Sequence, residues 1–232
     1  MNTKFIKIIG AFSLLFLLSS CDLGLQEQFN FVPEANTDNP LENMTAWEWI
    51  QSRANSAVGT PFLPMEYDYL KAAIIKADMV EEYNQVATKE RTFLLLNNSA
   101  FIGNGNVINI ITGSSVVTAG ETAEQAMSRV DTPAELLKLK TVLKYHIVTQ
   151  YILQVPTLYK QDTDYLFQTL IPGADGLIAF RRNTIYQITV NFSAAPLPST
   201  ATSLPRTCIR HNYQFKNGIG HILAAPVRNK PY

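Results

Sequence analysis

Carboxylates and aromatic rings in one stretch of this chain are the side chains best placed to bind a ligand. Asp162 and Asp164 alternate in an extended polar segment, so both carboxylates point to one side and could bind calcium or a sugar hydroxyl. A polar loop is the simpler interpretation, which we favour. Nearby rings could stack on sugars or anchor a protein interface. The predicted surface binding residues are Tyr159, Asp162, Asp164 and Tyr165.

The histidines and the cysteine at position 208 form no catalytic or metal-binding motif. His146, His211 and His221 are widely scattered, and a His146–His221 metal pair would need a third ligand. Cys208 and His211 lie three residues apart in a predicted strand, so they should point to opposite faces, which predicts a buried, inert thiol. The sequence also lacks a Gly-x-Ser-x-Gly motif and a glycine-rich phosphate loop. We expect no catalytic residue, no cofactor and no metal.

The N-terminal residues have the pattern of an export signal. Lys4 and Lys7 precede an apolar run from Ile8 to Leu18. This run is shorter than the roughly 20 apolar residues that a membrane-spanning helix needs. A short positive start, an apolar centre and small residues afterwards are typical of a secretory signal peptide. We expect a signal peptide over residues 1–20.

The signal ends in Leu18-Ser19-Ser20-Cys21, which resembles the bacterial lipobox. The resemblance implies that Cys21 is acylated, for example with palmitate, and tethers the mature chain to a membrane. An ordinary signal peptide with a coincidental cysteine is the alternative. Residues 21–44 are polar and poor in apolar side chains, which predicts a lipidated N-terminus followed by a flexible tether. We expect an outer-membrane lipoprotein exposed at the cell surface; the choice of leaflet stays open.

Composition excludes nucleic acid as an expected partner. The full chain has 19 basic and 19 acidic residues, and the signal contains two of the lysines, so 17 against 19 leaves a mature net charge of −2. A near-neutral domain has no electrostatic attraction to nucleic acid. The residues after the tether suffice for one domain.

The order of the predicted elements indicates an α+β fold. Helices are expected over Thr45–Ser56 and Met65–Tyr83 and from the Thr132-Pro133 cap onward, the last one deeply buried. Gly103–Gly120 is expected to be a loop with extended character. Strands are predicted over Thr92–Leu96, Ile147–Val155, Tyr165–Ile171, Leu177–Phe180, Thr184–Phe192, Cys208–Phe215 and Ile219–Val227. Helices that precede most of the strands are typical of α+β domains.

Three stretches resemble the signatures of the fasciclin-type domain. Arg91–Phe101 resembles the first signature, in which a Thr-Phe strand enters a polar turn ending in Ala-Phe. Leu143–Val148 contains the Tyr-His pair of the family, and Asn217–Leu223 resembles its closing Asn-Gly-x-x-His signature. All three occur in the family's order over its usual domain length. The signature residues are Thr92, Phe93, Tyr145, His146, Asn217, Gly218 and His221.

The resemblance implies a single fasciclin-like domain over residues 45–228, a wedge of β-strands packed with several helices. It also implies adhesion, in which the Tyr-His pair would take part; a buried structural histidine is the interpretation of His146 that we favour. Two features depart from the family: Asn97-Asn98 replaces the usual Pro-Thr pair, and residues 103–131 and 159–204 form long inserts. Such inserts are where binding specificity normally lies.

These observations predict a non-enzymatic, lipid-anchored binding module that mediates adhesion or protein–protein contact at the bacterial surface. The alternative is an accessory lipoprotein of a TonB-dependent outer-membrane complex for glycan uptake, in contact with the transporter or an oligosaccharide. An envelope hydrolase that uses carboxylates in the inserts is a third, less favoured hypothesis. Expected partners are the membrane, through the lipid, and a protein or glycan at the cell surface.

Overall fold

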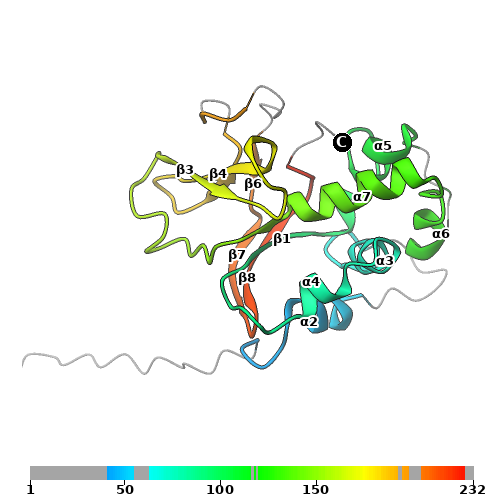
Figure 1. The fold of residues 1–232 in the computed structure, drawn as a ribbon, viewed down its shortest axis with the longest axis horizontal. Coiled ribbons are helices and arrows are strands. Elements are labelled where there is room, and N and C mark those ends of the chain that lie inside the picture. The colour runs from blue at the N-terminus through cyan, green and yellow to red at the C-terminus, as the bar shows by residue number, and fades with distance from the viewer. Residues whose placement is uncertain are drawn as a thin grey trace, which may run out of the picture. The chain divides into compact units, whose positions relative to one another are not determined.

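A computed structural model of the chain describes residues 41–54, 63–115, 118, 120–192, 195–198 and 205–227 (Figure 1). The predicted signal peptide, Cys21 and most of the tether lie outside these residues. The described residues belong to one compact unit, Asn39–Tyr232, which mixes helices with two sheets as the α+β prediction requires. Within them, no helix combines the length and apolarity that crossing a bilayer demands.

The first sheet contains the buried centre of the fold and has the strand order β2-β1-β8-β7. Its central strands β1 (Thr92–Leu96) and β8 (Gly218–Leu223) are parallel and fully buried. The strand predicted at residues 92–96 is therefore confirmed. Its apolar run is typical of a strand covered on both faces. Short β2 (Ile147–Val148) lies on one edge, and β7 (Arg210–Phe215) lies on the other.

The second sheet is antiparallel and has the order β3-β4-β5-β6. It consists of β3 (Asp164–Gln168), β4 (Leu177–Arg182), β5 (Ile188–Val190) and β6 (Arg206–Thr207). The strands predicted over 147–155 and 184–192 were too long. The first is only the two residues of β2, and the second begins at Ile188 because Tyr186, at φ +63°, turns the chain.

The single helix predicted over Met65–Tyr83 is wrong, because the chain forms two helices there. They are α3 (Asp68–Lys76) and α4 (Val80–Asn84). Asp78 adopts φ +53°, while its amide donates to Ile75 and the next amide donates to Ile74. This hydrogen-bond pattern is a Schellman motif, which ends a helix with a left-handed residue, and aspartate tolerates that conformation better than most side chains do.

The loop predicted over Gly103–Gly120 is also wrong in part, because it contains helix α5 (Val107–Thr112). Its β-branched side chains favour strands, yet Val107, Ile108 and Ile111 are buried on one helical face. Burial therefore outweighs local propensity here. Gly113, at φ +74°, ends the helix.

Capping boxes begin three of the helices in the described part of the chain. Thr45 starts α2 (Ala46–Ser52), Thr122 starts α6 (Ala123–Met127) and Thr132 starts α7 (Pro133–Tyr145). In each box the threonine side chain accepts from the third helical amide, and a Glu or Gln side chain there accepts from the threonine amide. The predicted start of α7 is confirmed. Its expected deep burial holds only for its second half.

The turn between β7 and β8 joins the sheet to the helices. Asn217 is fully buried, accepts from the amide of Ala46 (2.9 Å) and donates to the carbonyl of Tyr83 (2.8 Å). Asn217-Gly218 stands between two predicted strands, and this pair predicts a hairpin because both residues tolerate positive φ. The hairpin is confirmed, but only its glycine has a positive φ: Gly218 lies at +154°. A Cβ on Gly218 would lie 2.4 Å from the carbonyl oxygen of Arg91, so this site requires glycine.

We expect Gly218→Ala to lower the free energy of unfolding by about 3 kcal/mol, because strain in φ adds to the backbone clash. Urea unfolding measures the change. Gly105→Ala is the matched control, since Gly105 has φ +76° but open space around it. The control should cost only about 1 kcal/mol. Equal losses in the two variants would show that the clash with Arg91 does not exist.

Candidate functional site

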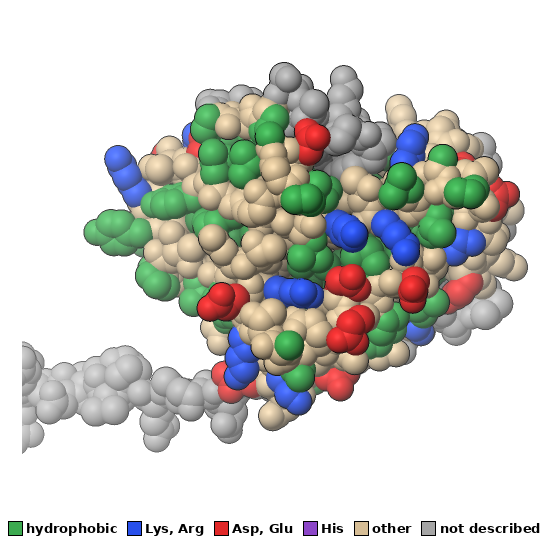
Figure 2. All heavy atoms as spheres, in the orientation of Figure 1, with side chains coloured by type: hydrophobic (Ala, Val, Ile, Leu, Met, Phe, Trp, Pro, Cys, Tyr) green, Lys and Arg blue, Asp and Glu red, His purple; other side chains and the backbone are tan. Residues whose placement is uncertain are grey.

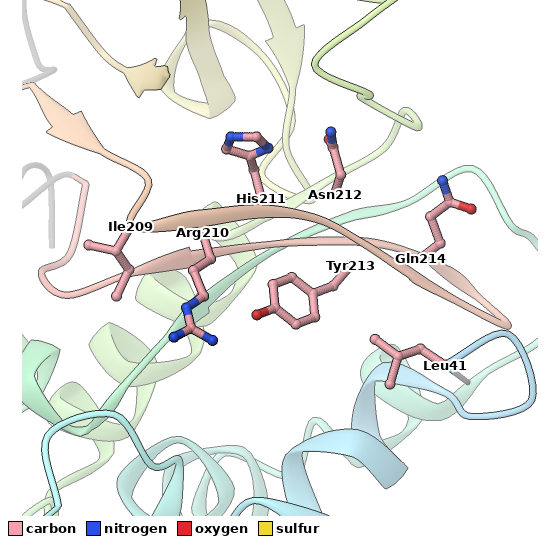
Figure 3. A pocket seen from close by; sticks show the side chains of 7 residues that line it. All are labelled: Leu41, Ile209, Arg210, His211, Asn212, Tyr213 and Gln214. Atoms are coloured by element: carbon pink, nitrogen blue, oxygen red, sulfur yellow. The ribbon is translucent and has the colours of Figure 1, made fainter. Parts of the chain in front are cut away.

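A surface groove of about 600 Å³ follows the outer edge of β7. Six consecutive residues of the chain line it, from Ile209 to Gln214, together with Leu41 (Figure 3). In the part of the chain that the structure describes, β7 pairs with β8 on one side only. The groove therefore has the length and direction of a strand.

A β-bulge decides which side chains face each side of this groove. Arg210 pairs with Ile222 and Tyr213 with Gly220, so three steps on β7 match two steps on β8. In a regular strand, residues three apart point to opposite faces. The extra residue reverses this, and Figure 3 shows Arg210 and Tyr213 on one side of β7 and His211 and Asn212 on the other.

The buried ring of His221 stabilises the bulge. Its Nδ1 accepts a hydrogen bond from the amide of Asn212 (3.2 Å), the bulge residue with φ +65°. Its Nε2 lies 2.9 Å from the carbonyl oxygen of Ile152 and must carry the proton, because a carbonyl only accepts. The Asn212 side chain in turn accepts from the amide of Gln154 (3.1 Å). One imidazole thus connects β8, the bulge and the loop after β2.

A smaller pocket of about 180 Å³ opens on the face of β7 that carries Arg210 and Tyr213. Both residues line the groove and the pocket, so the two cavities share a wall. The floor is aromatic, since the ring of Trp49 lies 4.8 Å from that of Tyr67 and 5.5 Å from that of Tyr213. The lining residues are Trp49, Arg53, Met65, Tyr67, Arg210, Tyr213 and Ile222.

The polar groups of this pocket are hydrogen-bond donors. Desolvation raises the pKa of Tyr67 far above its usual range, so its hydroxyl keeps its proton. A hydrogen bond with the side chain of Tyr213 raises the pKa of the exposed Arg210. Arg53 forms an ion pair with Glu66 (3.1 Å) just outside the lining. Two guanidinium groups and two phenols can therefore face one ligand, while Glu66, which pairs with Arg53, lies outside the lining.

Loops beside the second sheet expose a cluster of apolar side chains, which we call the loop patch. Its members are 48 to 78% exposed: Val155, Tyr159, Ile185 and Tyr186. Arg182 lies beneath it, donating to the carbonyls of Leu158 (2.8 Å) and Tyr159 (2.6 Å), with the ring of Tyr186 4.8 Å from its guanidinium carbon. Figure 2 shows exposed hydrophobic side chains at this end of the molecule.

The four residues predicted to bind at the surface differ in their positions. Tyr159 is exposed, whereas the Tyr165 hydroxyl is occupied, accepting from the amide of Lys160 (2.8 Å). Asp164 forms a two-pronged ion pair with Arg181 across the β3–β4 ladder, at 3.0 and 2.5 Å. Asp162 sits in a turn at φ +51°. The turn at Asp162 breaks the extended alternation expected to put both carboxylates on one side, and the described residues contain no group of three metal-ligating side chains.

The other signature residues are also engaged inside the fold. The Thr92 hydroxyl donates to the carbonyl of Gln150 (2.6 Å), and the ring of Phe93 stacks on Tyr83 at 5.5 Å. Tyr145 donates from its hydroxyl to the carbonyl of Leu177 (2.8 Å), which joins α7 to the second sheet.

His146 is 1% exposed and ends helix α7. Its Nδ1 lies 2.7 Å from the carbonyl oxygen of Val142 and donates to it, while Nε2 accepts from the amide of Val227 (3.2 Å). With both ring nitrogens occupied, the imidazole has no free group for an external ligand in this conformation.

Cys208 is buried, and desolvation raises the pKa of its thiol far above its usual range. The thiol is therefore protonated and a poor nucleophile at neutral pH. His211 lies on the side of β7 opposite Arg210 and Tyr213 (Figure 3), and its Nε2 lies 3.2 Å from the side-chain amide nitrogen of Gln154. The structure thus gives Cys208 no activating partner among the described residues.

Comparisons with known proteins show a likeness to solved structures, but no match at the level of sequence families. No family model and no curated protein matches the sequence. Among solved structures, the chain is similar to a FAS1 domain pair from the insect cell adhesion molecule fasciclin I. The likeness has a TM-score of 0.45 and 12% identity, and covers 79% of this chain and 50% of that one. The match therefore spans about half of the neighbour's length.

Sequence reasoning missed the pocket residues, above all Arg210 and Tyr213. Strand periodicity places them on opposite faces, and only the bulge brings them together. One local signal existed, because Asn212 interrupts a predicted strand and asparagine tolerates positive φ. Trp49 and Tyr67 come from distant segments, and no spacing in the sequence predicts their contact.

The buried histidines make a prediction about pH. Desolvation lowers the pKa of both His146 and His221 from 6.5 to about 4. The unfolded chain therefore takes up protons first as pH falls, and the folded state loses relative stability. We expect full stability above pH 6.5 and a loss of about 3 kcal/mol per histidine as pH approaches 4.

Urea unfolding near neutral pH and near pH 5 measures this dependence. The second pH lies about midway between the pKa values of the unfolded and folded states. His146→Gln should remove one histidine's share of the pH dependence as well as some stability. A free energy of unfolding that stays constant across this window would contradict the assignment of two neutral buried rings.

Proposed function

We propose that this protein is a non-enzymatic binding module that mediates adhesion or protein–protein contact. A lipid on Cys21 anchors it to the outer membrane. One observation carries the proposal: the bulge in β7 turns Arg210 and Tyr213 to one side of an open groove. An exposed edge with aromatic and arginine side chains has the composition of a binding surface.

The signature residues support a fasciclin-like module in which these side chains organise the fold. They lie in or beside the first sheet and α7, and their polar groups bind partners within the chain. Surface groups outside the signatures are then left to contact a partner. The loop patch and the β7 groove both meet this requirement, and Gln154 contacts Tyr186 and His211 between them.

A glycan partner is the second candidate, favoured by two rings in the loop patch. Tyr159 is 78% exposed and Tyr186 is 53% exposed. Exposed rings of this kind can stack on sugar faces. This interpretation corresponds to an accessory lipoprotein of an outer-membrane glycan-uptake complex.

The lipid anchor gives the first test. Each buried methylene of an acyl chain contributes about 0.8 kcal/mol, and two or more chains hold a protein stably at a membrane. We expect Cys21→Ser to move the protein from the membrane fraction to the soluble fraction, measured by fractionation and immunoblotting. Metabolic labelling with a palmitate analogue should mark only the wild type. Retention of the Cys21→Ser variant in the membrane fraction, together with no label on the wild type, would contradict the anchor.

The loop patch gives the second test. We expect the double variant Tyr159→Ser/Ile185→Ser to reduce attachment of cells that display the protein, because it removes exposed apolar contact area. Leu137→Ser is the matched control, since Leu137 is equally apolar and 66% exposed but lies on helix α7. Reduced growth on a glycan with normal attachment would favour the uptake role. No change in either assay would exclude the patch.

A further inference from the structure

Building on the proposed binding function, we propose that the β7 groove binds an extended acidic peptide segment of a partner protein. A carboxylate of that segment would enter the smaller pocket, between Arg53 and Arg210 and beside the hydroxyls of Tyr67 and Tyr213. The ligand class is thus a peptide with acidic side chains, bound along a sheet edge.

Charge complementarity is the first argument. The pocket lining contains two guanidinium groups and two phenols but no carboxylate. Both phenols carry a hydroxyl that can donate a hydrogen bond, and burial keeps that of Tyr67 protonated. Glu66 reduces the positive charge through its ion pair with Arg53, so Arg210 is the main cation. A carboxylate accepts such charge-assisted hydrogen bonds well.

The shape of the two cavities is the second argument. The groove follows an edge strand over six residues, which is the geometry that an added peptide strand requires. Side chains of an extended peptide alternate between its two faces. Because the groove and the pocket share Arg210 and Tyr213, a strand in the groove would place every second side chain on the face where the pocket opens, and one of them beside the pocket.

The pocket size and its floor favour a carboxylate side chain over a sugar ring. About 180 Å³ is small compared with the several hundred cubic ångströms of sites that enclose a drug-sized ligand. Trp49 and Tyr67 are 7% and 1% exposed, so neither ring offers an open face for stacking on a sugar. Their apolar surfaces instead limit the access of water, which strengthens the hydrogen bonds of a bound carboxylate.

A short synthetic peptide of alternating glutamate and threonine is the probe that tests this inference. Its fluorescein-labelled form is titrated with the mature chain, and fluorescence anisotropy reports binding. We expect saturable binding that weakens as salt is raised. The matched peptide with glutamine for glutamate should bind about tenfold more weakly or not at all.

Two charge-reversal variants locate the site. Arg210→Glu should weaken binding of the glutamate peptide by about tenfold or more, because it places like charge beside the carboxylate. Lys216→Glu makes the same change in net charge at the exposed turn of the same hairpin, outside both cavities, and should change binding less than about twofold. Equal effects of the two variants would show that only net charge matters and would overturn the proposal.

The remaining outcomes separate this inference from the proposed function. Binding of oligogalacturonate, a carboxylate-bearing glycan, without binding of the glutamate peptide would overturn the peptide assignment. Failure of both probes with intact cell attachment would overturn this inference and leave the binding module standing. Loss of cell attachment in the loop-patch variant, with normal peptide binding, would support the peptide site in the groove and would assign adhesion to the loop patch.

Discussion

The two hydrogen bonds of the buried His221 ring are the constraint on which the candidate site depends. One holds the amide of Asn212 in the bulge, and the other holds the carbonyl of Ile152. Without the bulge, Arg210 and Tyr213 would point to opposite faces of β7, and the pocket would lose one of the two. A residue with no exposed surface thereby determines which side chains a ligand can contact.

The same arrangement separates residues that form the fold from residues that can bind. Asn217, Tyr145, His146 and His221 each bond to backbone or side-chain groups within the chain. Such buried polar groups are costly to leave unpaired, so their partners are fixed. Arg210, Tyr159 and Tyr186, by contrast, keep exposed surface on the sheet edge and loops. A resemblance carried by the first group therefore predicts architecture more directly than it predicts a ligand.

Local signals predicted much of the fold, and long-range contacts account for the errors. The caps at Thr45 and Thr132 were predictable because a capping box is contained in four residues. The box at Thr122 and Gln125 carries the same signal and was missed, and so was helix α6. Helix α5 was missed because its β-branched residues favour a strand, while burial decides the outcome. At the site, Tyr159 was predictable from its region, but the bulge depends on a partner nine residues away.

A double-mutant cycle tests the central claim most directly, namely that the bulge presents Arg210 to a carboxylate in the groove. The cycle combines Arg210→Gln in the protein with glutamine for glutamate in the alternating peptide, and titration measures all four affinities. The account predicts a coupling free energy of about 1 kcal/mol or more, because the two groups are in contact. Additive effects, with no coupling between the two changes, would contradict it.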